Sequence, residues 1–359
     1  MADGERKRVG GGRPGRGLTL ADVASALQVS KATVSNAYNR PDQLSAQLRE
    51  RILAEADRLG YPGPDPIAAT FSRRRAGAIG LVFDDPLTFA LTDPAEVLFV
   101  TGIGEVSERN GVGVLLIPQG TSVGLVQRAL VDGFICHCDV DGDSRVDTAM
   151  GRGLPVVVVD GPVRAHAGHV GIDDRQSARL AARHLIDLGH RRIAVLASPL
   201  QPDGFVGRAD LARQQSARHH VMRERLEGYR AGLAAGGVAW ADVPVAECAP
   251  YGRESAYRAA LDLLDGAERP TALLAASDEL ALGAMRAATE RDLTVPEHLS
   301  IVGFDDAPPA AWSNPGLTTV HQPHRDKGRT AAEQLLAPTT QTETAFPTRL
   351  VVRGSTAPP

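Results

Sequence analysis

Short apolar runs alternate with helical segments from residue 77 onwards, and this alternation limits the fold more than any other feature. The runs AIGLVF (78–83), VGVLLIP (112–118), VDGFICH (131–137) and LPVVVVD (154–160) have strand length and are separated by segments with helical spacing. Strands that are apolar throughout are buried on both faces, as in parallel sheets covered by crossover helices. The pattern therefore predicts an α/β body with a doubly wound parallel sheet.

The same pattern restarts after residue 173. A helical segment at 175–190 leads into the run RRIAVLA, and further runs follow at 243–248, 271–276 and 299–304. Two series of strands predict two sheets, and hence two lobes. We expect lobe 1 to contain about 77–172 and 317–337, and lobe 2 about 173–316 and 338–359. Ligands of such folds bind at the carboxyl ends of the strands, here the cleft between the lobes.

Residues 18–61 have the spacing of three short helices. Thr19 followed by Asp22 indicates a capped helix from Leu20, and Ser30 opens a second helix after a turn too short for anything but a helix-turn-helix. The third helix follows Ser45 and ends at Gly60. The second helix leaves polar side chains on its outer side, which is either a DNA-reading surface or an ordinary solvated face.

Charge is distributed unevenly between this head and the body. Residues 1–75 carry 13 basic and 8 acidic side chains, whereas the remainder carries 26 and 35. A basic head on an acidic body is typical of a protein that binds nucleic acid through one part only. Residues 1–17 combine arginines with glycines and no apolar periodicity, so we expect a disordered basic tail.

The segment TLADVASALQVSKATVSNAYNRPDQLSAQLRERILAEADRLGY resembles the head of the LacI/GalR family of bacterial repressors. In that family the second helix enters the major groove, which implies base-reading roles for Lys31, Ala32 and Asn36. Asn36 stands where many relatives carry arginine, so contact with adenine suits its amide better than contact with guanine. The resemblance also implies DNA contacts, many of them to phosphates, from Thr19, Thr33, Ser35 and Asn39.

Residues 62–76 resemble the hinge of the same family, which inserts a leucine into the minor groove of the operator. Phe71 is the aligned residue here, and an additional residue between Tyr61 and Pro64 separates this chain from the usual pattern. Arg73, with Arg74 and Arg75, could neutralise phosphates behind it. The alternative is a plain linker.

The resemblance continues through the body, in RERLEGYRAGL, SDELALGAM, VPEHLSIVGFDD and PGLTTVHQP. It implies a periplasmic-binding-protein-like effector domain in residues 77–359, with Arg225, Asp278 and Asp305 at positions that hydrogen-bond ligands, commonly sugar hydroxyls. Asp85 and Phe205 complete the predicted effector-binding set. For each of the three the alternative is a structural role as a helix cap or a strand-end ion pair, and Asp278, at the start of a helix, is in the position of a cap.

Several other sites and locations are disfavoured. The chain has no run of eighteen apolar residues and no apolar segment behind its basic N-terminus, so we expect neither a membrane span nor secretion, but a cytoplasmic protein. Cys136, His137 and Cys138 are consecutive on a strand whose side chains alternate, so we expect no metal site from these three. We find no nucleophile, base and orienting group in a catalytic pattern, and expect no cofactor.

These observations favour a ligand-responsive DNA-binding regulator that acts as a homodimer on pseudopalindromic double-stranded DNA. The resemblance implies a repressor of carbohydrate-utilisation genes, released from its operator by a sugar or sugar derivative. A solute-binding protein of a transporter would need a signal segment and would have no use for a helix-turn-helix. An enzyme on the same two-lobed scaffold remains the third alternative.

Overall fold

The structure is a computed structural model that describes residues 18–64, 75–120, 122–138, 140–337 and 342–359. The chain divides into two compact units, residues 1–76 and 77–359, which are described separately. The predicted tail (1–17), Phe71 and Arg73 lie outside the described residues. No helix within the described ranges is long and apolar enough to cross a membrane.

The first unit contains a small three-helix domain. Its helices are α1 (Leu20–Leu27), α2 (Lys31–Asn39) and α3 (Ala46–Leu59), with a 3₁₀ turn, η1 (Pro41–Gln43), before α3. Thr19 and Asp22 cap α1 through hydrogen bonds of 2.7 Å, and Ser30 and Ser45 accept bonds from the backbone of α2 and α3. The helices share one core: Val23, Ala24, Val34, Ala37, Ile52, Ala56 and Tyr61. The helix-turn-helix prediction is confirmed.

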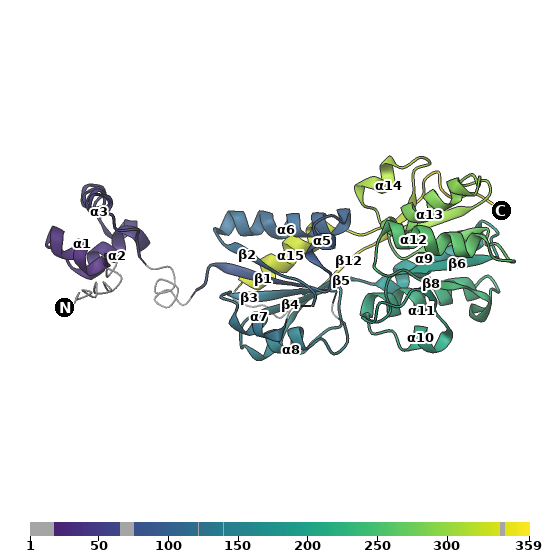
Figure 1. The fold of residues 1–359 in the computed structure, drawn as a ribbon, viewed down its shortest axis with the longest axis horizontal. Helices are drawn as coiled ribbons and strands as arrows, with labels where there is room; N and C mark the ends of the chain where they lie inside the picture. The colour runs from purple at the N-terminus through teal and green to yellow at the C-terminus, as the bar shows by residue number, and fades with distance from the viewer. Residues whose placement is uncertain (1–17, 65–74, 121, 139, 338–341) are drawn as a thin grey trace, which may run out of the picture. The chain divides into compact units, whose positions relative to one another are not determined.

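The first lobe of the second unit has a six-stranded parallel sheet in the order β12-β5-β4-β3-β1-β2 (Figure 1). Its strands are β1 (Ala78–Phe83), β2 (Gly113–Ile117), β3 (Gly133–His137), β4 (Val156–Val159), β5 (Gly168–Ile172) and β12 (Glu343–Phe346). Its helices are α5 (Leu87–Ala90), α6 (Pro94–Asn110), α7 (Val123–Arg128), α8 (Ser144–Gly151) and α15 (His324–Leu336). Helices α6 and α15 pack on one face of the sheet, and α7 and α8 on the other.

Glycines allow α6 and α15 to cross closely. A Cβ atom at Gly102 would lie 2.0 Å from the backbone oxygen of Arg325, and one at Gly328 would lie 2.0 Å from that of Phe99. A side chain at either position would therefore push the two helices apart. Gly102 thus has a packing role inside a helix.

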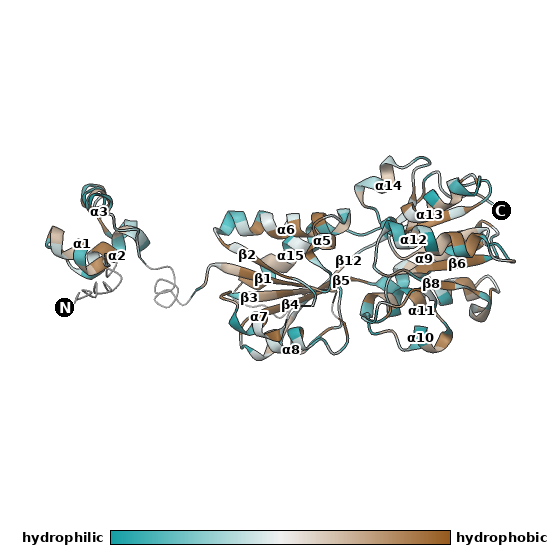
Figure 2. Ribbon diagram, in the orientation of Figure 1, coloured by the Kyte–Doolittle hydropathy of each residue, from teal (hydrophilic) through white to brown (hydrophobic). Residues whose placement is uncertain are grey.

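The second lobe has a seven-stranded sheet in the order β13-β11-β10-β9-β6-β8-β7. Its strands are β6 (Ile193–Ala197), β7 (Gly207–Arg208), β8 (Val245–Glu247), β9 (Ala272–Ala275), β10 (Ser300–Asp305), β11 (Thr318–His321) and β13 (Arg349–Val351). The inner ladders are parallel, and the edge strands β7 and β13 are antiparallel. Figure 2 shows that the apolar residues concentrate in the strands of both sheets.

The helices of the second lobe cover both faces of its sheet. They are α9 (Asp174–Asp187), α10 (Leu211–Gln215), α11 (His220–Ala234), η2 (Trp240–Asp242), α12 (Arg253–Leu264), α13 (Asp278–Glu290) and α14 (Pro308–Trp312). Helix α9 packs against α11, and α12 packs against α13. The fold is therefore the predicted one, a helix-turn-helix domain followed by a two-lobed α/β domain with parallel sheets.

The lobe boundaries near the C-terminus differ from the prediction. Strand β11, expected in lobe 1 with the rest of 317–337, pairs with β10 in the second sheet, and only α15 returns to the first lobe. Strand β12, expected in lobe 2, pairs with β5 in the first sheet, whereas β13 pairs with β11. Pairing between strands far apart in the sequence decides these positions, and the apolar pattern of a short strand does not reveal its partner.

Candidate functional sites

Helix α2 carries the predicted DNA-contacting side chains on its outer side. Lys31 and Ala32 are exposed, and Thr33, Ser35 and Asn36 are partly exposed, whereas Val34 and Ala37 of the same helix are buried. The helix thus presents short polar groups and one cation on a rigid three-helix support. A surface of this kind can approach base edges in the major groove.

The polar groups of α2 are held by short-range bonds at the surface. The hydroxyl of Thr33 lies 2.8 Å from that of Ser30, and Asn39 donates to Ser35 at 3.3 Å. Asn36 donates to the side-chain oxygen of Gln43 at 3.1 Å. Thr19, at the start of α1, is bonded to Asp22. These contacts are exposed or partly exposed, so DNA groups can replace them at little cost.

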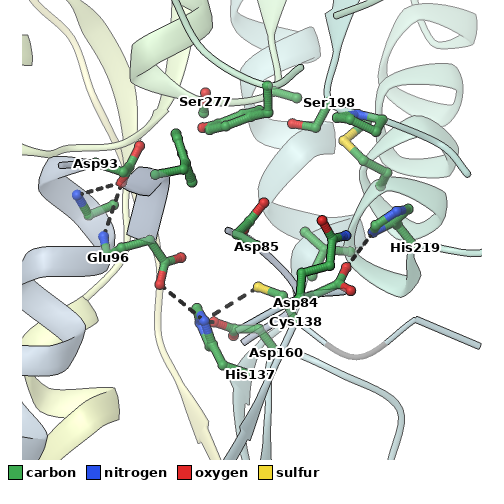
Figure 3. Close-up of a pocket in the computed structure, with 18 of the residues that line it drawn as sticks. Asp84, Asp85, Asp93, Glu96, His137, Cys138, Asp160, Ser198, His219 and Ser277 are labelled. Carbon is green, nitrogen blue, oxygen red and sulfur yellow. Dashed lines mark hydrogen bonds and ion pairs between the residues drawn. The ribbon is translucent and has the colours of Figure 1, made fainter. Parts of the chain in front are cut away.

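A cavity of about 620 Å³ lies between the two lobes of the second unit (Figure 3). The carboxyl ends of strands from both sheets contribute to its lining: Asp85 after β1, His137 at the end of β3, Asp160 after β4, Ser277 after β9, Asp305 at the end of β10 and Gln322 after β11. The cavity therefore lies in the predicted cleft and is large enough for a small organic molecule.

Arg225, from α11, lines the cavity, and residues outside the lining and the backbone hold its guanidinium in place. Its Nε donates to Asp174 at 2.8 Å and its Nη1 to the backbone oxygen of Ala276 at 2.5 Å. The guanidinium carbon lies 3.6 Å from the centre of the Phe304 ring. Although burial disfavours the charge, Asp174 and Asp305 raise the pKa of Arg225. The side chain is thus a preorganised cationic donor.

Asp305 belongs to a buried polar chain that joins the lobes. Its Oδ1 accepts from Gln322 at 2.7 Å, and Gln322 accepts in turn from Lys327 at 2.7 Å. Lys327, on α15 of the first lobe, is fully buried and is also paired with Asp160. Asp305 has a φ of 122°, which is strained for a residue with a side chain and typical of functional sites.

Two predicted ligand-contacting residues lie outside the cavity lining. Asp278 is buried behind it, where its oxygens accept from Thr319 at 2.6 Å and from the backbone nitrogen of Ala307 at 2.8 Å. It holds the turn after Asp305, and Ser277 faces the cavity in its place. Phe205 is 36% exposed and packs under the guanidinium of Arg213. Direct ligand contact by Asp278 or Phe205 is therefore not supported.

The cavity has a large excess of carboxylates, one of which is the predicted Asp85. The acidic lining residues are Asp84, Asp85, Asp93, Glu96, Asp160 and Asp305, against the single arginine, Arg225. Burial, reinforced by neighbouring carboxylates, raises the pKa of Asp85 to about 7 and that of Asp93 to about 8. With these pKa values the two groups are partly or largely protonated near neutral pH, so they can donate hydrogen bonds as well as accept them. The lining supplies only one arginine to balance an anionic ligand.

An aromatic pair spans the same cavity and was not predicted. Phe89 of the first lobe and Tyr251 of the second meet edge to face, with ring centres 4.6 Å apart. Aromatic faces beside hydrogen-bonding groups suit a ligand with both apolar and hydroxyl-bearing surfaces. Nothing in the sequence indicates this pair, because Phe89 and Tyr251 lie far apart in the chain.

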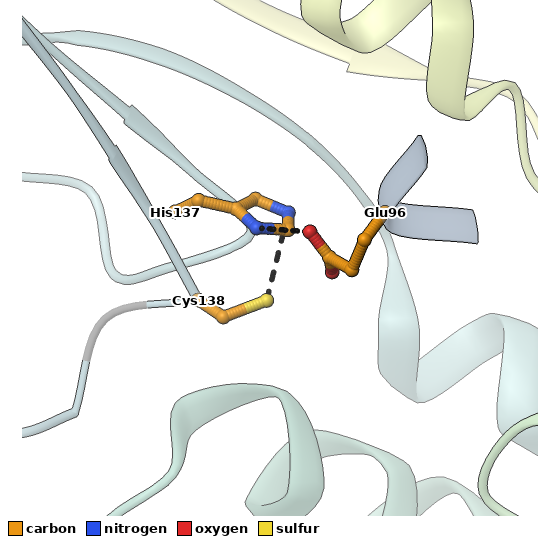
Figure 4. Close-up of side chains that lie close together, drawn as sticks. All are labelled: Glu96, His137 and Cys138. Atoms are coloured by element: carbon orange, nitrogen blue, oxygen red, sulfur yellow. Dashed lines mark hydrogen bonds and ion pairs between the residues drawn. The ribbon is translucent and has the colours of Figure 1, made fainter. Parts of the chain in front are cut away.

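A further group that the sequence did not reveal is formed by Glu96, His137 and Cys138 (Figure 4). Glu96 approaches His137 from α6, and Cys138 follows it directly at the end of β3. Cys136 points to the opposite side of the sheet, into the apolar core under α7 and α8. The predicted alternation holds between Cys136 and His137 but not between His137 and Cys138, which lie on the same side, and the carboxylate from α6 takes the place of Cys136 in the group.

Comparisons with known proteins agree with this architecture. A family model described as bacterial regulatory proteins, lacI family, matches residues 19–63, and one described as periplasmic binding protein-like domain matches residues 182–356. An HTH-type transcriptional regulator of Mycobacterium tuberculosis is 42% identical over 332 residues, which cover 90% of this chain and 92% of the relative.

Solved structures resemble the chain over nearly its full length. The lac repressor dimer bound to operator and the anti-inducer ONPF is 27% identical with a TM-score of 0.73, covering 95% of this chain and 100% of that one. A complex of the transcriptional regulator CelR with cellobiose is 28% identical with a TM-score of 0.68, covering 96% and 100%.

Proposed function

This chain belongs to the LacI family of bacterial regulatory proteins, and we propose that it is a repressor of carbohydrate-utilisation genes that a neutral sugar-like effector releases from its operator. In this proposal a homodimer binds a pseudopalindromic operator in the cytoplasm, because two identical heads match two half-sites. The similarity to a lac repressor dimer on operator DNA supports the proposal.

Lys31, Ala32 and Asn36 read base edges in this proposal, and Thr19, Thr33, Ser35 and Asn39 contact phosphates or hold the register. Their placement on or beside the outer side of α2 supports these roles. Phe71 and Arg73 are proposed as the minor-groove wedge and a phosphate contact, from the sequence alone.

The observation that carries the effector part of the proposal is the cavity between the lobes, in which Arg225 and Asp305 face the same space. A rigid donor and a fixed acceptor suit adjacent hydroxyl groups. The excess of carboxylates favours an uncharged polyhydroxylated ligand over a phosphorylated one. The similarity to a regulator in complex with cellobiose supports the sugar class.

Selection from a library of randomised DNA duplexes tests the proposal. We expect a pseudopalindromic consensus, bound by a dimer, with an affinity that falls steeply with salt as phosphate contacts are screened. A panel of neutral monosaccharides and disaccharides, with hexose phosphates beside them, is then titrated into the complex. Release by a neutral sugar supports the proposal, whereas a non-palindromic consensus or release by phosphorylated sugars alone contradicts it.

A further inference from the structure

Three different metal-binding side chains converge at one wall of the cavity. Glu96 of α6, His137 of β3 and Cys138 each offer a donor atom, and these three atoms lie within 4.8 Å of one another. Figure 4 shows the carboxylate of Glu96 and the thiol of Cys138 approaching the two nitrogens of the imidazole ring. All three side chains line the cavity, so the site can be reached from it.

The spacing between Glu96 and one nitrogen of His137 is that of two ligands of the same ion. His137 Nδ1 lies 3.2 Å from Glu96 Oε2, and His137 Nε2 lies 3.6 Å from Cys138 Sγ. A hydrogen bond between charged groups would be shorter, about 2.7–2.9 Å. In a tetrahedral zinc site, bond lengths of about 2.0–2.3 Å place neighbouring N and O ligands about 3.3 Å apart. An ion bound to Nδ1 of His137 therefore matches the spacing to Glu96, whereas the Cys138 thiol, which lies beside the other ring nitrogen, has to move towards the ion.

The backbone brings the thiol to this position. Along β3, Cys136 and His137 face opposite sides of the sheet, and a continued strand would turn Cys138 away from His137. Cys138 instead has a φ of 54°, a left-handed conformation that is unfavourable for a residue with a side chain. Strain of this kind is typical of functional sites.

The imidazole is also held from its other sides. Its ring stacks on Phe99 of α6, with centres 4.2 Å apart and an interplanar angle of 18°. Asp160 lies 3.5 Å from Nε2 and is itself fixed by the buried Lys327. A carboxylate beside the ring of a metal-binding histidine orients the ring, and such partners are usual around metal sites.

We propose that Glu96, His137 and Cys138 bind a thiophilic divalent cation, with Zn²⁺ as the best match. One carboxylate oxygen, one imidazole nitrogen and one thiolate suit zinc, whereas Mg²⁺ and Ca²⁺ prefer oxygen ligands alone. Three protein ligands leave a fourth position for water or another ligand. The proposal goes beyond the regulatory function and does not depend on the identity of the effector.

Cobalt(II) titration of the full-length protein tests the site. Tetrahedral Co²⁺ substitutes for zinc, and its bond to a thiolate gives a charge-transfer band in the near ultraviolet. The buffer is mildly alkaline, because the ion has to displace the thiol proton and burial raises the pKa of Cys138 to about 11. We expect one equivalent of Co²⁺ to produce the band and Zn²⁺ to abolish it.

The other two cysteines provide matched controls, because Cys136 and Cys248 are buried and lie outside the cavity lining. Cys138→Ser should lose the band, whereas Cys136→Ser and Cys248→Ser should keep it. Glu96→Gln should keep the band but bind Zn²⁺ at least about tenfold more weakly, as measured by competition with a chelating dye. Circular dichroism of each metal-free variant checks its fold.

Absence of the band in the wild type would overturn the proposal, as would its persistence in Cys138→Ser. Loss of the band in Cys136→Ser or Cys248→Ser, with the band kept in Cys138→Ser, would place the metal elsewhere. If Cys138→Ser does not fold, unchanged Zn²⁺ affinity in Glu96→Gln overturns the proposed ligand set. Operator binding by metal-free protein is measured separately, so failure of the metal site leaves the regulatory proposal standing.

Discussion

Helix α2 and the cavity both present polar side chains, but they hold them in opposite ways. On α2, each polar group is at least partly exposed and makes short-range bonds, such as that of Asn36 to Gln43. At the cavity, Arg225 and Asp305 of the lining and Lys327 behind it are buried, and two or more contacts fix each of them. Substitutions on α2 should therefore change which DNA sequence is bound. Substitutions around the cavity should change the free energy of unfolding as well as ligand binding.

The largest effect that this contrast predicts is at Lys327. Lys327→Ala removes a fully buried cation and leaves Asp160 buried without its main partner, so we expect a loss of about 3–5 kcal/mol in the free energy of unfolding. Urea unfolding followed by circular dichroism measures it. Arg258→Ala, which breaks an exposed pair with Glu254, should cost about 1 kcal/mol or less. If the two substitutions lower the free energy of unfolding equally, the buried ion pair contributes no more to stability than the exposed one.

The next effect concerns the rigid support of the cavity. Gly102→Ala places a methyl group against the backbone of α15 and should destabilise the protein by about 1–3 kcal/mol. Gly104, two residues away on the same helix, has no neighbour within 4 Å of a Cβ atom. Gly104→Ala should be neutral or stabilise by up to about 1 kcal/mol. Thermal unfolding compares them, and a stable Gly102→Ala variant would show that α6 and α15 can separate freely.

On α2 we expect changes in specificity rather than stability. Lys31→Ala and Asn36→Ala should each reduce discrimination between operator and mutated operator by about 1–3 kcal/mol. The unfolding free energy should change by no more than about 0.5 kcal/mol, because both side chains lie at the surface. Selection of DNA sequences by each variant provides the measurement. If Asn36→Ala selects the wild-type consensus, Asn36 does not read bases.

The smallest effect concerns the start of α2. Ser30 accepts a hydrogen bond from the backbone nitrogen of Thr33 at 3.0 Å, so Ser30→Ala should destabilise the head by about 1 kcal/mol. Ser25, exposed on α1, is the control position, and Ser25→Ala should have little effect. Thermal unfolding, monitored by hydrogen exchange of the backbone amides in the head, measures the effects of both substitutions. An unchanged Ser30→Ala variant would show that the cap does not stabilise α2.

Features that depend on neighbouring residues could be predicted from the sequence. The caps at Thr19, Ser30 and Ser45 and the end of α3 at Gly60 follow from short motifs, and the structure has each of them. The segment of helical spacing expected between the runs at 78–83 and 112–118 contains α6. The strands of both sheets are apolar because they are buried on both faces, so their pattern was also informative.

Features that depend on distant contacts could not be predicted. The positions of β11 and β12 follow from their partners, β10 and β5, and their own residues do not identify these. At the start of α13, the sequence could not show that Ser277 faces the cavity while Asp278 turns inward. Glu96 meets His137 because α6 packs over β3, which no spacing in the chain reveals.

In the proposed function, a neutral ligand in the cavity controls the affinity for DNA. Such control requires the ligand to bind the DNA-bound and the DNA-free protein with different affinities. The coupling is reciprocal, so DNA changes the affinity for the ligand by the same factor. Asp305→Asn tests it better than Arg225→Ala, which would leave the buried Asp174 without its partner. Asp265→Asn, at an exposed carboxylate paired with Arg291, is the control.

The decisive measurement is the fluorescence anisotropy of the selected duplex, titrated with the most effective neutral sugar of the panel. We expect Asp305→Asn to bind the duplex as the wild type does but to need roughly ten- to a hundredfold more sugar for release, since one charged hydrogen bond is worth about 1.5–3 kcal/mol. Asp265→Asn should respond like the wild type. The proposed function would be contradicted if the sugar released Asp305→Asn from DNA as readily as it releases the wild type. It would also be contradicted if the phosphate ester of the same sugar released the wild type equally well.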